Sequence, residues 1–403
     1  LRWQSFIAGT VGYSLYYVCR TSLNVVKKPI LESGALDATQ LGVIGSALLF
    51  AYAIGKFVNG FLSDHSNIKR FMAAGLAVSA VANLLVGILG IYFHSAPEGG
   101  QLSMNILEIS KHTIPMSAQY LFFPLTFVGF GVLGAMFPFH TWSPDGHASA
   151  PTAVSMLHAG VLMKLGGYGC FRVAIFLMPE AANELSWIFL ILTGTSVVYG
   201  ALSAIKQTDL KYINAYSSVS HCGLVLFAIL MLNQTAMTGA VLQMLSHGLM
   251  TALFFALIGM IYGRTHTRDI REMGGLMKIM PYLGVCYVIA GLASLGLPGL
   301  SGFVAEMTVF VGAFQETDTF HRVFTIIACT SIVITAVYIL RVVGKLLYGS
   351  VVNEHHYALT DANWYERFST IILIVAIAGI GLAPLWLSDM IRASLGSVLA
   401  ALQ

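Results

Sequence analysis

Long apolar segments alternate with short polar loops along almost the whole chain of 403 residues. A helix needs roughly 20 apolar residues to cross a bilayer, and most of these segments reach that length. The short alternating segments that are typical of a membrane β-barrel do not occur in the sequence. We therefore predict an all-α, polytopic membrane protein with about eleven transmembrane helices. The predicted spans are residues 6–26, 41–62, 71–94, 116–137, 152–178, 186–205, 212–232, 238–262, 282–315, 323–349 and 369–395.

The ninth predicted span, residues 282–315, is long and contains the run GLPG at residues 296–299. Glycine and proline interrupt helices. An interrupted helix at membrane depth occurs where it is buried in protein or lines a wet cavity. The sequence therefore predicts one broken helix near residues 296–302, in a place that suits a functional group.

Composition supports the membrane class and limits the partners. The chain is 57% hydrophobic and 10% charged, whereas a soluble domain carries about 25% charged residues. The net charge of +3 is too small to indicate nucleic-acid binding. Basic residues gather in a few loops, which the positive-inside rule assigns to the cytoplasm. These residues are Lys69, Arg70, Lys206, Lys211, Arg264, Arg268 and Arg271.

The cysteines give no sign of a metal or redox site. They are scattered through apolar segments, and no C-x-x-C pair occurs. Zinc and iron–sulfur sites need closely spaced thiolate ligands. We expect buried, reduced thiols and no metal or cofactor in this chain. The five cysteines are Cys19, Cys170, Cys222, Cys286 and Cys329.

Four ionisable residues lie inside otherwise apolar spans: Lys164, His221, His247 and Glu306. A charge at membrane depth is costly and points to function. Lys164 has apolar residues on both sides, so its ammonium cannot readily reach the membrane surface. Either histidine alone is as readily a packing residue as a functional one. Glu306 follows directly on the predicted break. The set suits proton transport better than bond-making chemistry, because no nucleophile–base pair or nucleotide loop accompanies it.

Two cations, Arg20 and Lys56, lie in the first two predicted spans without an acidic partner in either. They suit an anion such as phosphate, or they extend to the membrane surface from near a helix end. The segments Gly12–Ser22 and Gly55–Met72 resemble the first two helices of the organophosphate:phosphate antiporters of the major facilitator superfamily. The resemblance covers about residues 1–84. It implies an alternative function, the exchange of sugar phosphate or glycerol phosphate for phosphate, although no second half of such a transporter follows.

Sequence blocks beyond residue 84 resemble the antiporter-like subunit M of NADH:quinone oxidoreductase (complex I). The resemblance covers about residues 84–395 and is very specific, because the blocks occur in family order and spacing. It implies a proton-translocating, multi-pass subunit in the bacterial inner membrane. The blocks are Phe137–Gly169, Lys206–Gly223, Gln243–Phe255, Arg264–Leu276 and Leu292–Glu306.

The resemblance also implies a role for each candidate residue. Lys164 matches the central lysine of the family, His221 and His247 match its relay histidines, and Glu306 matches the carboxylate of its broken helix. Three further residues are expected to support the relay: His140, His147 and Lys211.

Cofactors and partners follow from the same resemblance. NADH and quinone would be used by partner subunits, because this chain carries no flavin or iron–sulfur motif. The implied partners are the other membrane subunits of complex I, together with the lipid bilayer.

Two features of the family are missing. Leu133 stands where the family usually has a lysine. The glutamate that pairs with this lysine in the family is also missing, because residues 42–61 contain no carboxylate. We therefore predict two parts, a major-facilitator-like part over residues 1–84 and an antiporter-like part over residues 85–403. A natural fusion, a deliberate chimera and an error in the gene sequence all remain open.

Overall fold

The computed structural model describes residues 81, 84–96 and 100–402. The chain divides into two compact units, Leu1–Ala74 and Gly75–Gln403. Every described residue belongs to the second unit. The predicted boundary between the two parts near residue 84 stays a prediction.

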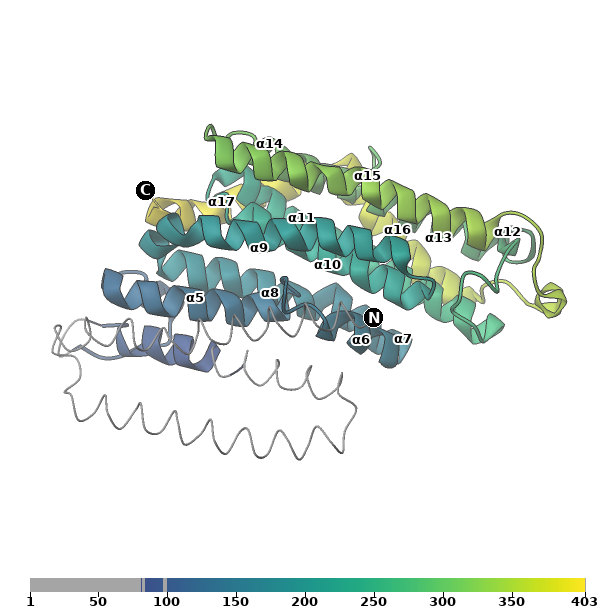
Figure 1. Cartoon of the computed structure of the whole chain (residues 1–403), viewed down its shortest axis with the longest axis horizontal. Helices are drawn as coiled ribbons and strands as arrows, with labels where there is room; N and C mark the ends of the chain where they lie inside the picture. The colour runs from purple at the N-terminus through teal and green to yellow at the C-terminus, as the bar shows by residue number, and fades with distance from the viewer. Residues whose placement is uncertain (1–80, 82–83, 97–99, 403) are drawn as a thin grey trace, which may run out of the picture. The chain divides into compact units, whose positions relative to one another are not determined.

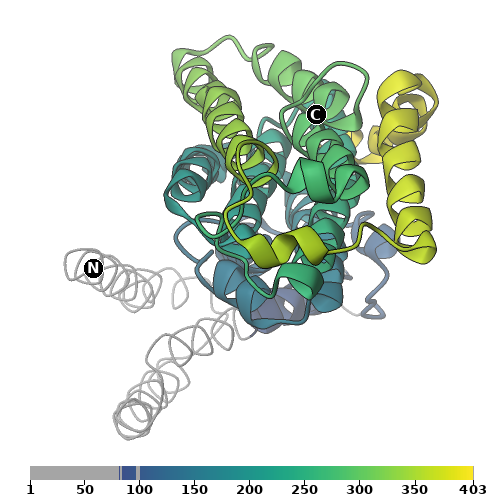
Figure 2. The ribbon, with the colours of Figure 1, turned by 90° about the vertical axis from the view of Figure 1, so that its right-hand side faces the viewer.

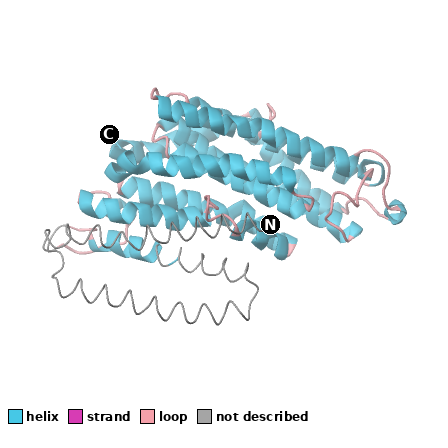
Figure 3. Ribbon diagram, in the orientation of Figure 1, coloured by secondary structure: helices cyan, strands magenta, loops and turns pink. Residues whose placement is uncertain are grey.

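Helices form the regular structure of the described residues, apart from one isolated bridge between Asp209 and Asp269 (Figure 3). A short helix, Leu84–Phe93, comes first. The α-helices that follow are α4 Ile106–Ile109, α5 Met116–Leu133, α6 Trp142–Ser149, α7 Thr152–Leu157, α8 Met163–Gly169, α9 Pro179–Lys206, α10 Leu210–Ile229, α11 Gln234–Thr265, α12 Leu276–Ile279, α13 Pro281–Ser294, α14 Ser301–Ala313, α15 Thr319–Leu347, α16 Trp364–Leu382 and α17 Leu385–Leu402. Two π-helical segments, η1 His158–Leu162 and η2 Cys170–Ile175, flank α8, and a 3₁₀ helix, η3 Glu354–Ala358, precedes α16. The predicted all-α class is confirmed.

Six helices in the described part of the chain are long and apolar enough to cross a membrane, namely α5, α9, α10, α11, α15 and α16. A helix of about 20 residues is about 30 Å long, which matches the hydrocarbon core of a bilayer. The predicted polytopic membrane class is therefore confirmed. The predicted spans 6–26 and 41–62 lie outside the described residues.

One predicted span is wrong. The apolar segment 369–395 is not a single helix, because α16 ends at Leu382 and α17 begins at Leu385. Between them, Ala383 has φ −132° and ψ 65°. The ring of Pro384 disfavours helical backbone at the residue before it, and this explains the interruption.

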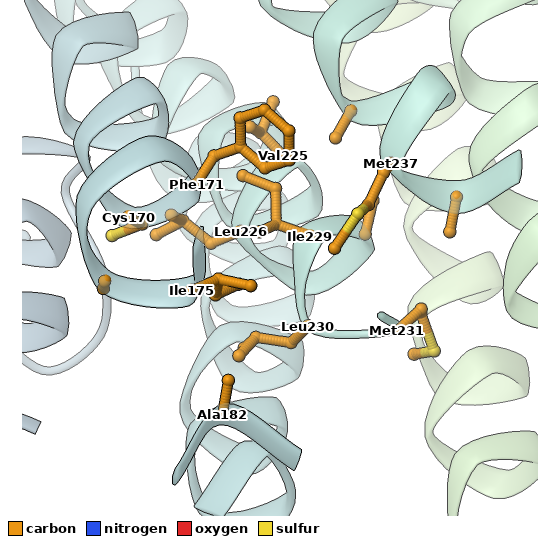
Figure 4. Packing of buried hydrophobic residues seen from close by; sticks show 14 of the residues in the cluster. Cys170, Phe171, Ile175, Ala182, Val225, Leu226, Ile229, Leu230, Met231 and Met237 are labelled. Carbon is orange, nitrogen blue, oxygen red and sulfur yellow. The ribbon is translucent and has the colours of Figure 1, made fainter. Parts of the chain in front are cut away.

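Helix α10 lies inside the bundle and packs against α9 and α11 (Figure 1). In an apolar stretch of 18 residues within α10, 89% of the residues are buried. In the corresponding stretch of α16, which lies at the margin of the bundle (Figure 2), 11% are buried. Figure 4 shows part of the packing, with Phe171 and Ile175 of η2 close to Val225 and Leu226 of α10. Because protein shields it from lipid, α10 can carry polar groups at little cost.

The predicted broken helix is confirmed between α13 and α14. Gly296 and Gly299 have φ values of 66° and 95°, which residues with a side chain rarely adopt. Glycine can adopt them, so the backbone can turn out of α13 and into α14. A methyl group on Gly296 would also lie 3.0 Å from Oε2 of Glu306. The break thus brings backbone close to the carboxylate that follows it.

Several basic loops meet at the end of the bundle where α10 begins, here called the basic end. Arg268 pairs with Asp209 at 3.0 Å and donates to the carbonyl of Ala148 at 2.8 Å. Arg341 donates to the carbonyl of Gln207 at 2.8 Å. The positive-inside rule assigns this end to the cytoplasm.

Candidate proton relay site

Lys164, His221, His247 and Glu306 come from four different helices, and the structure brings them into one line. Lys164 Nζ lies 2.7 Å from His247 Nδ1. The rings of His247 and His221 lie 5.0 Å apart, and His221 Nδ1 lies 3.3 Å from Glu306 Oε1. Their order in space therefore differs from their order in the chain, because His247 rather than His221 contacts the lysine.

The line is enclosed by protein. His221, His247 and Glu306 are 5%, 1% and 8% exposed, and Lys164 is half-buried. Burying ionisable groups without water is costly unless each finds a partner. The contacts among the four groups supply part of that stabilisation.

The position of Lys164 depends on local backbone structure. Its ammonium donates to the carbonyl of Ala159, five residues earlier, across the π-helical segment η1. Such π-helical turns inside helices are frequent at functional sites. Across the contact, a methyl group on Gly248 of α11 would lie 2.8 Å from the carbonyl oxygen of Gly160. Two glycines thus allow the close approach that lets Lys164 reach His247.

His221 has partners on both ring nitrogens. Gln243 Nε2 lies 3.2 Å from Nδ1, and Ser294 Oγ lies 3.4 Å from Nε2. Because Glu306 also faces Nδ1, the histidine and the carboxylate can share one proton, either as imidazolium and carboxylate or as imidazole and carboxylic acid. The Oε1 atom of Gln243 is buried without a partner among the described residues. Rotating that amide would present Oε1 to an Nδ1–H, so Gln243 can serve both protonation states.

His247 has one nitrogen in the line and one outside it. The charged lysine only donates hydrogen bonds, so Nδ1 of His247 accepts and Nε2 carries the hydrogen. That Nε2 is buried without a partner among the described residues. Cys222 Sγ lies 4.0 Å from Nδ1. A cavity of about 10 Å³ beside Lys164 and Cys222 has room for one water.

The supporting candidates are not bonded to this line. His140 and His147 are 2% and 0% exposed, and the structure gives none of their ring nitrogens a partner among the described residues. Lys211 donates to the carbonyl of Ala150 at 2.6 Å, which ties the start of α10 to the end of α6. The ring of His158 lies 4.5 Å from that of His147. His158 was not among the sequence candidates, although it lies on the same continuous helix as Lys164, six residues earlier.

Of the three other residues named from the sequence, the structure describes only Leu133. Leu133 ends α5 and is half-buried. Arg20 and Lys56 lie outside the described residues.

Residues 45–335 match the profile of a family described as NADH:quinone oxidoreductase/Mrp antiporter, transmembrane. The chain is 38% identical over 364 residues to NAD(P)H-quinone oxidoreductase chain 4 2 of Thermosynechococcus vestitus, covering 87% of this chain and 67% of that protein. It is 36% identical over 375 residues to NAD(P)H-quinone oxidoreductase chain 4 1 of Picosynechococcus sp., covering 90% and 70%. For chain 4 2 of Synechococcus sp. (strain JA-3-3Ab), the identity is 35% and the coverage 85% and 65%. The chain thus spans about two thirds of the length of these curated relatives.

Solved structures share the fold. A chain of respiratory complex I from Thermus thermophilus with bound NADH superposes with a TM-score of 0.76 and 24% identity, covering 83% of this chain and 69% of that one. A chain of the Mrp complex from Dietzia sp. gives a TM-score of 0.68 at 18% identity, covering 82% and 69%. These matches show a shared fold, and the family profile together with the six long apolar helices of the described residues agrees with a multi-pass membrane protein.

The resemblance of residues 1–84 to the major facilitator superfamily finds no support in these comparisons. The family profile begins at residue 45, inside that segment. Part of the region that the motifs assigned to a phosphate-ester transporter therefore matches the antiporter family instead.

Proposed function

This chain belongs to the NADH:quinone oxidoreductase/Mrp antiporter family of transmembrane subunits, and from that premise we propose that it translocates protons across the bacterial inner membrane. In the finer assignment it is the counterpart of subunit M of a respiratory NADH:quinone oxidoreductase. Its partners are then the other membrane subunits of that complex. NADH oxidation and quinone reduction take place in those partners and supply the driving energy.

The observation that carries the proposal is the line from Lys164 through His247 and His221 to Glu306. The contact of Lys164 with His247, at 2.7 Å, is short enough for direct proton transfer, and that of His221 with Glu306, at 3.3 Å, needs only a slight approach. The middle step joins two rings whose centroids are 5.0 Å apart. A water or a small ring rotation bridges such a gap.

Each step moves one proton, and each histidine returns to its starting tautomer, by ring rotation or exchange with water, before the next proton passes. Lys164 gives a proton from its ammonium to His247 Nδ1 and becomes a neutral amine. The imidazolium of His247 rotates, or uses one water, to pass a proton across the 5.0 Å between the rings to His221, and His221 passes the proton on Nδ1 to Glu306 Oε1. The carboxylic acid then releases the proton, and Lys164 regains one from water. A charge in the membrane interior is costly. A second excess proton on the line is therefore disfavoured, and a proton that enters at Lys164 moves on before the next one arrives.

The test is proton flux into proteoliposomes that contain the full chain and an internal pH dye, driven by a potassium diffusion potential. We expect wild-type flux, and flux reduced to that of empty liposomes in Lys164→Ala and in the longer, uncharged Lys164→Met. Lys278→Ala is the matched control, because Lys278 is an exposed lysine in α12. Wild-type flux in both Lys164 variants would refute the relay. Flux of sodium ions in place of protons under the same potential would refute the proton assignment.

A further inference from the structure

A second line of polar side chains, here called the polar file, leads away from His221. Its members are Ser294, Tyr338, Ser217 and Asn214. Ser294, the last residue of α13, lies 3.4 Å from His221 Nε2. Tyr338 on α15 lies near enough to Ser294 to interact with it, although the two hydroxyls make no direct hydrogen bond of standard geometry. The same hydroxyl lies 2.7 Å from Ser217 Oγ. The file therefore connects the His221–Glu306 pair to a polar position nearer the start of α10.

Helix α10 carries this file on one face. Asn214, Ser217 and His221 are spaced by three and four residues, the spacing that aligns side chains along a helix. Seven residues span about 10 Å along the axis. The three residues are 5%, 2% and 5% exposed. The stripe thus runs from the relay toward the basic end, inside the protein.

A small cavity lies where the file stops. Its polar lining comes from Asn214, Ser217, Tyr287 and Tyr338, and its volume is about 10 Å³. This is room for one water, and buried waters are held by two to four polar partners. Asn214 Nδ2 is buried without a partner among the described residues. A buried, unpaired amide donor costs about 1–3 kcal/mol, and a water in this cavity removes that cost.

We propose that a water in this cavity joins Asn214 to the Ser217–Tyr338 pair, and that the file is a second proton route linking the Glu306 end of the relay to the basic end. The inference rests on the proposed function and adds a path to it. Hydroxyl groups and water both donate and accept, so each member takes up one proton as it releases another. The file can therefore carry a proton to or from His221 Nε2 without changing the charge of any link.

Apolar side chains close the file toward the basic end. Leu210, Ile213, Phe254, Ile339 and Val342 complete the lining of the cavity. Beyond them, Arg341 holds the carbonyl of Gln207. The route is thus closed toward the basic end in the observed structure.

Hydroxyl-radical footprinting tests the water itself, because radicals formed from a bound water oxidise the side chains beside it. Tyr338 is 0% exposed, and we expect it to be oxidised several-fold faster than Phe123, which is also 0% exposed but lies in an apolar cluster. Asn214→Leu removes the amide and fills the cavity, so it should lower Tyr338 oxidation to the Phe123 rate. Equal rates for Tyr338 and Phe123 in the wild-type chain would overturn the inference.

Proton flux in the same proteoliposomes tests the route. Tyr338→Phe and Ser217→Ala each remove one oxygen atom, and we expect about tenfold slower flux, the effect of about 1.4 kcal/mol on a barrier. The double variant should match either single variant, because both cut one file. Tyr348→Phe, at the exposed end of α15, should leave the flux unchanged.

The two proposals fail in different ways. Absence of proton flux in the wild-type chain, or flux that survives loss of Lys164, refutes the relay. Tyr338 oxidation still reports on the water in either case. Lys164-dependent flux that is unaffected by Tyr338→Phe and Ser217→Ala sinks the second route alone.

Discussion

The contact between Gly160 and Gly248 sets how closely Lys164 approaches His247. In Gly248→Ala, the new methyl group would lie 2.8 Å from the carbonyl oxygen of Gly160. A relaxed contact needs about 3.5 Å, so the two helix segments must separate by about 0.7 Å. If the same displacement is added to the distance between Lys164 Nζ and His247 Nδ1, now 2.7 Å, the pair moves to about 3.4 Å, where the hydrogen bond is long and weak.

The expected loss of proton-transfer rate follows from the strength of the hydrogen bond between Lys164 and His247. A hydrogen bond to a charged group contributes about 1.5–3 kcal/mol. Losing about 1.5 kcal/mol at the first step of the relay slows it by roughly tenfold. Forcing extra volume into a packed interior also costs about 1–3 kcal/mol of stability. We therefore expect Gly248→Ala to fold with a lower Tm and to conduct protons about tenfold more slowly.

Gly263→Ala supplies the control on the same helix. A methyl group on Gly263 meets nothing within 4 Å, so this change should stabilise α11 by about 0.5–1 kcal/mol and leave proton flux unaltered. Flux and Tm are measured on both variants in the same lipids. Equal flux in Gly248→Ala and Gly263→Ala would show that the glycine contact does not set the distance on which the relay depends.

Two further predictions concern the break and the helix ends. Gly296→Ala places a side chain at φ 66° and sets a methyl group 3.0 Å from Glu306 Oε2; the strain of about 1–2 kcal/mol should lower Tm and slow proton flux, and an unchanged Tm would contradict it. Arg264→Met removes the charge partner of Glu366, 2.6 Å away near the start of α16, while Glu366 keeps the N–H of Asn363; losing the hydrogen bonds between these charged groups should cost about 1.5–3 kcal/mol in thermal or denaturant unfolding. The double variant Arg264→Met/Glu366→Gln should recover part of that loss, because it leaves no unpaired carboxylate and its amide oxygen can still accept from Asn363 N–H; a double variant no more stable than the single one would count against the ion pair.

The sequence predicts the membrane class and the candidate relay residues for the same physical reason. Charged or titratable groups such as Lys164 and Glu306 stand out against an apolar background, where they are expensive and therefore rare. The GLPG run likewise marks the break by its backbone chemistry. These signals are local and need no knowledge of packing.

Other features depend on which helices pack together. The sequence does not reveal that Lys164 contacts His247 while Glu306 contacts His221, because that pairing follows from the packing of α11 against its neighbours. The polar file through Asn214 and Ser217 escapes notice for another reason, since neutral polar residues hardly change the apolar character of a span. The interruption before Pro384 rests on one residue in an otherwise continuous apolar run.

Cys222 gives this protein a built-in spectroscopic reporter. Its sulfur lies 4.0 Å from His247 Nδ1 and lines the cavity beside Lys164. The sulfur–hydrogen stretch of a thiol absorbs in an infrared window free of other protein bands, and its frequency follows the local electric field. Arrival of a proton at the lysine or the histidine shifts that band, so the charging of the pathway can be followed in real time without a dye, and Cys222→Ser identifies the band by removing it.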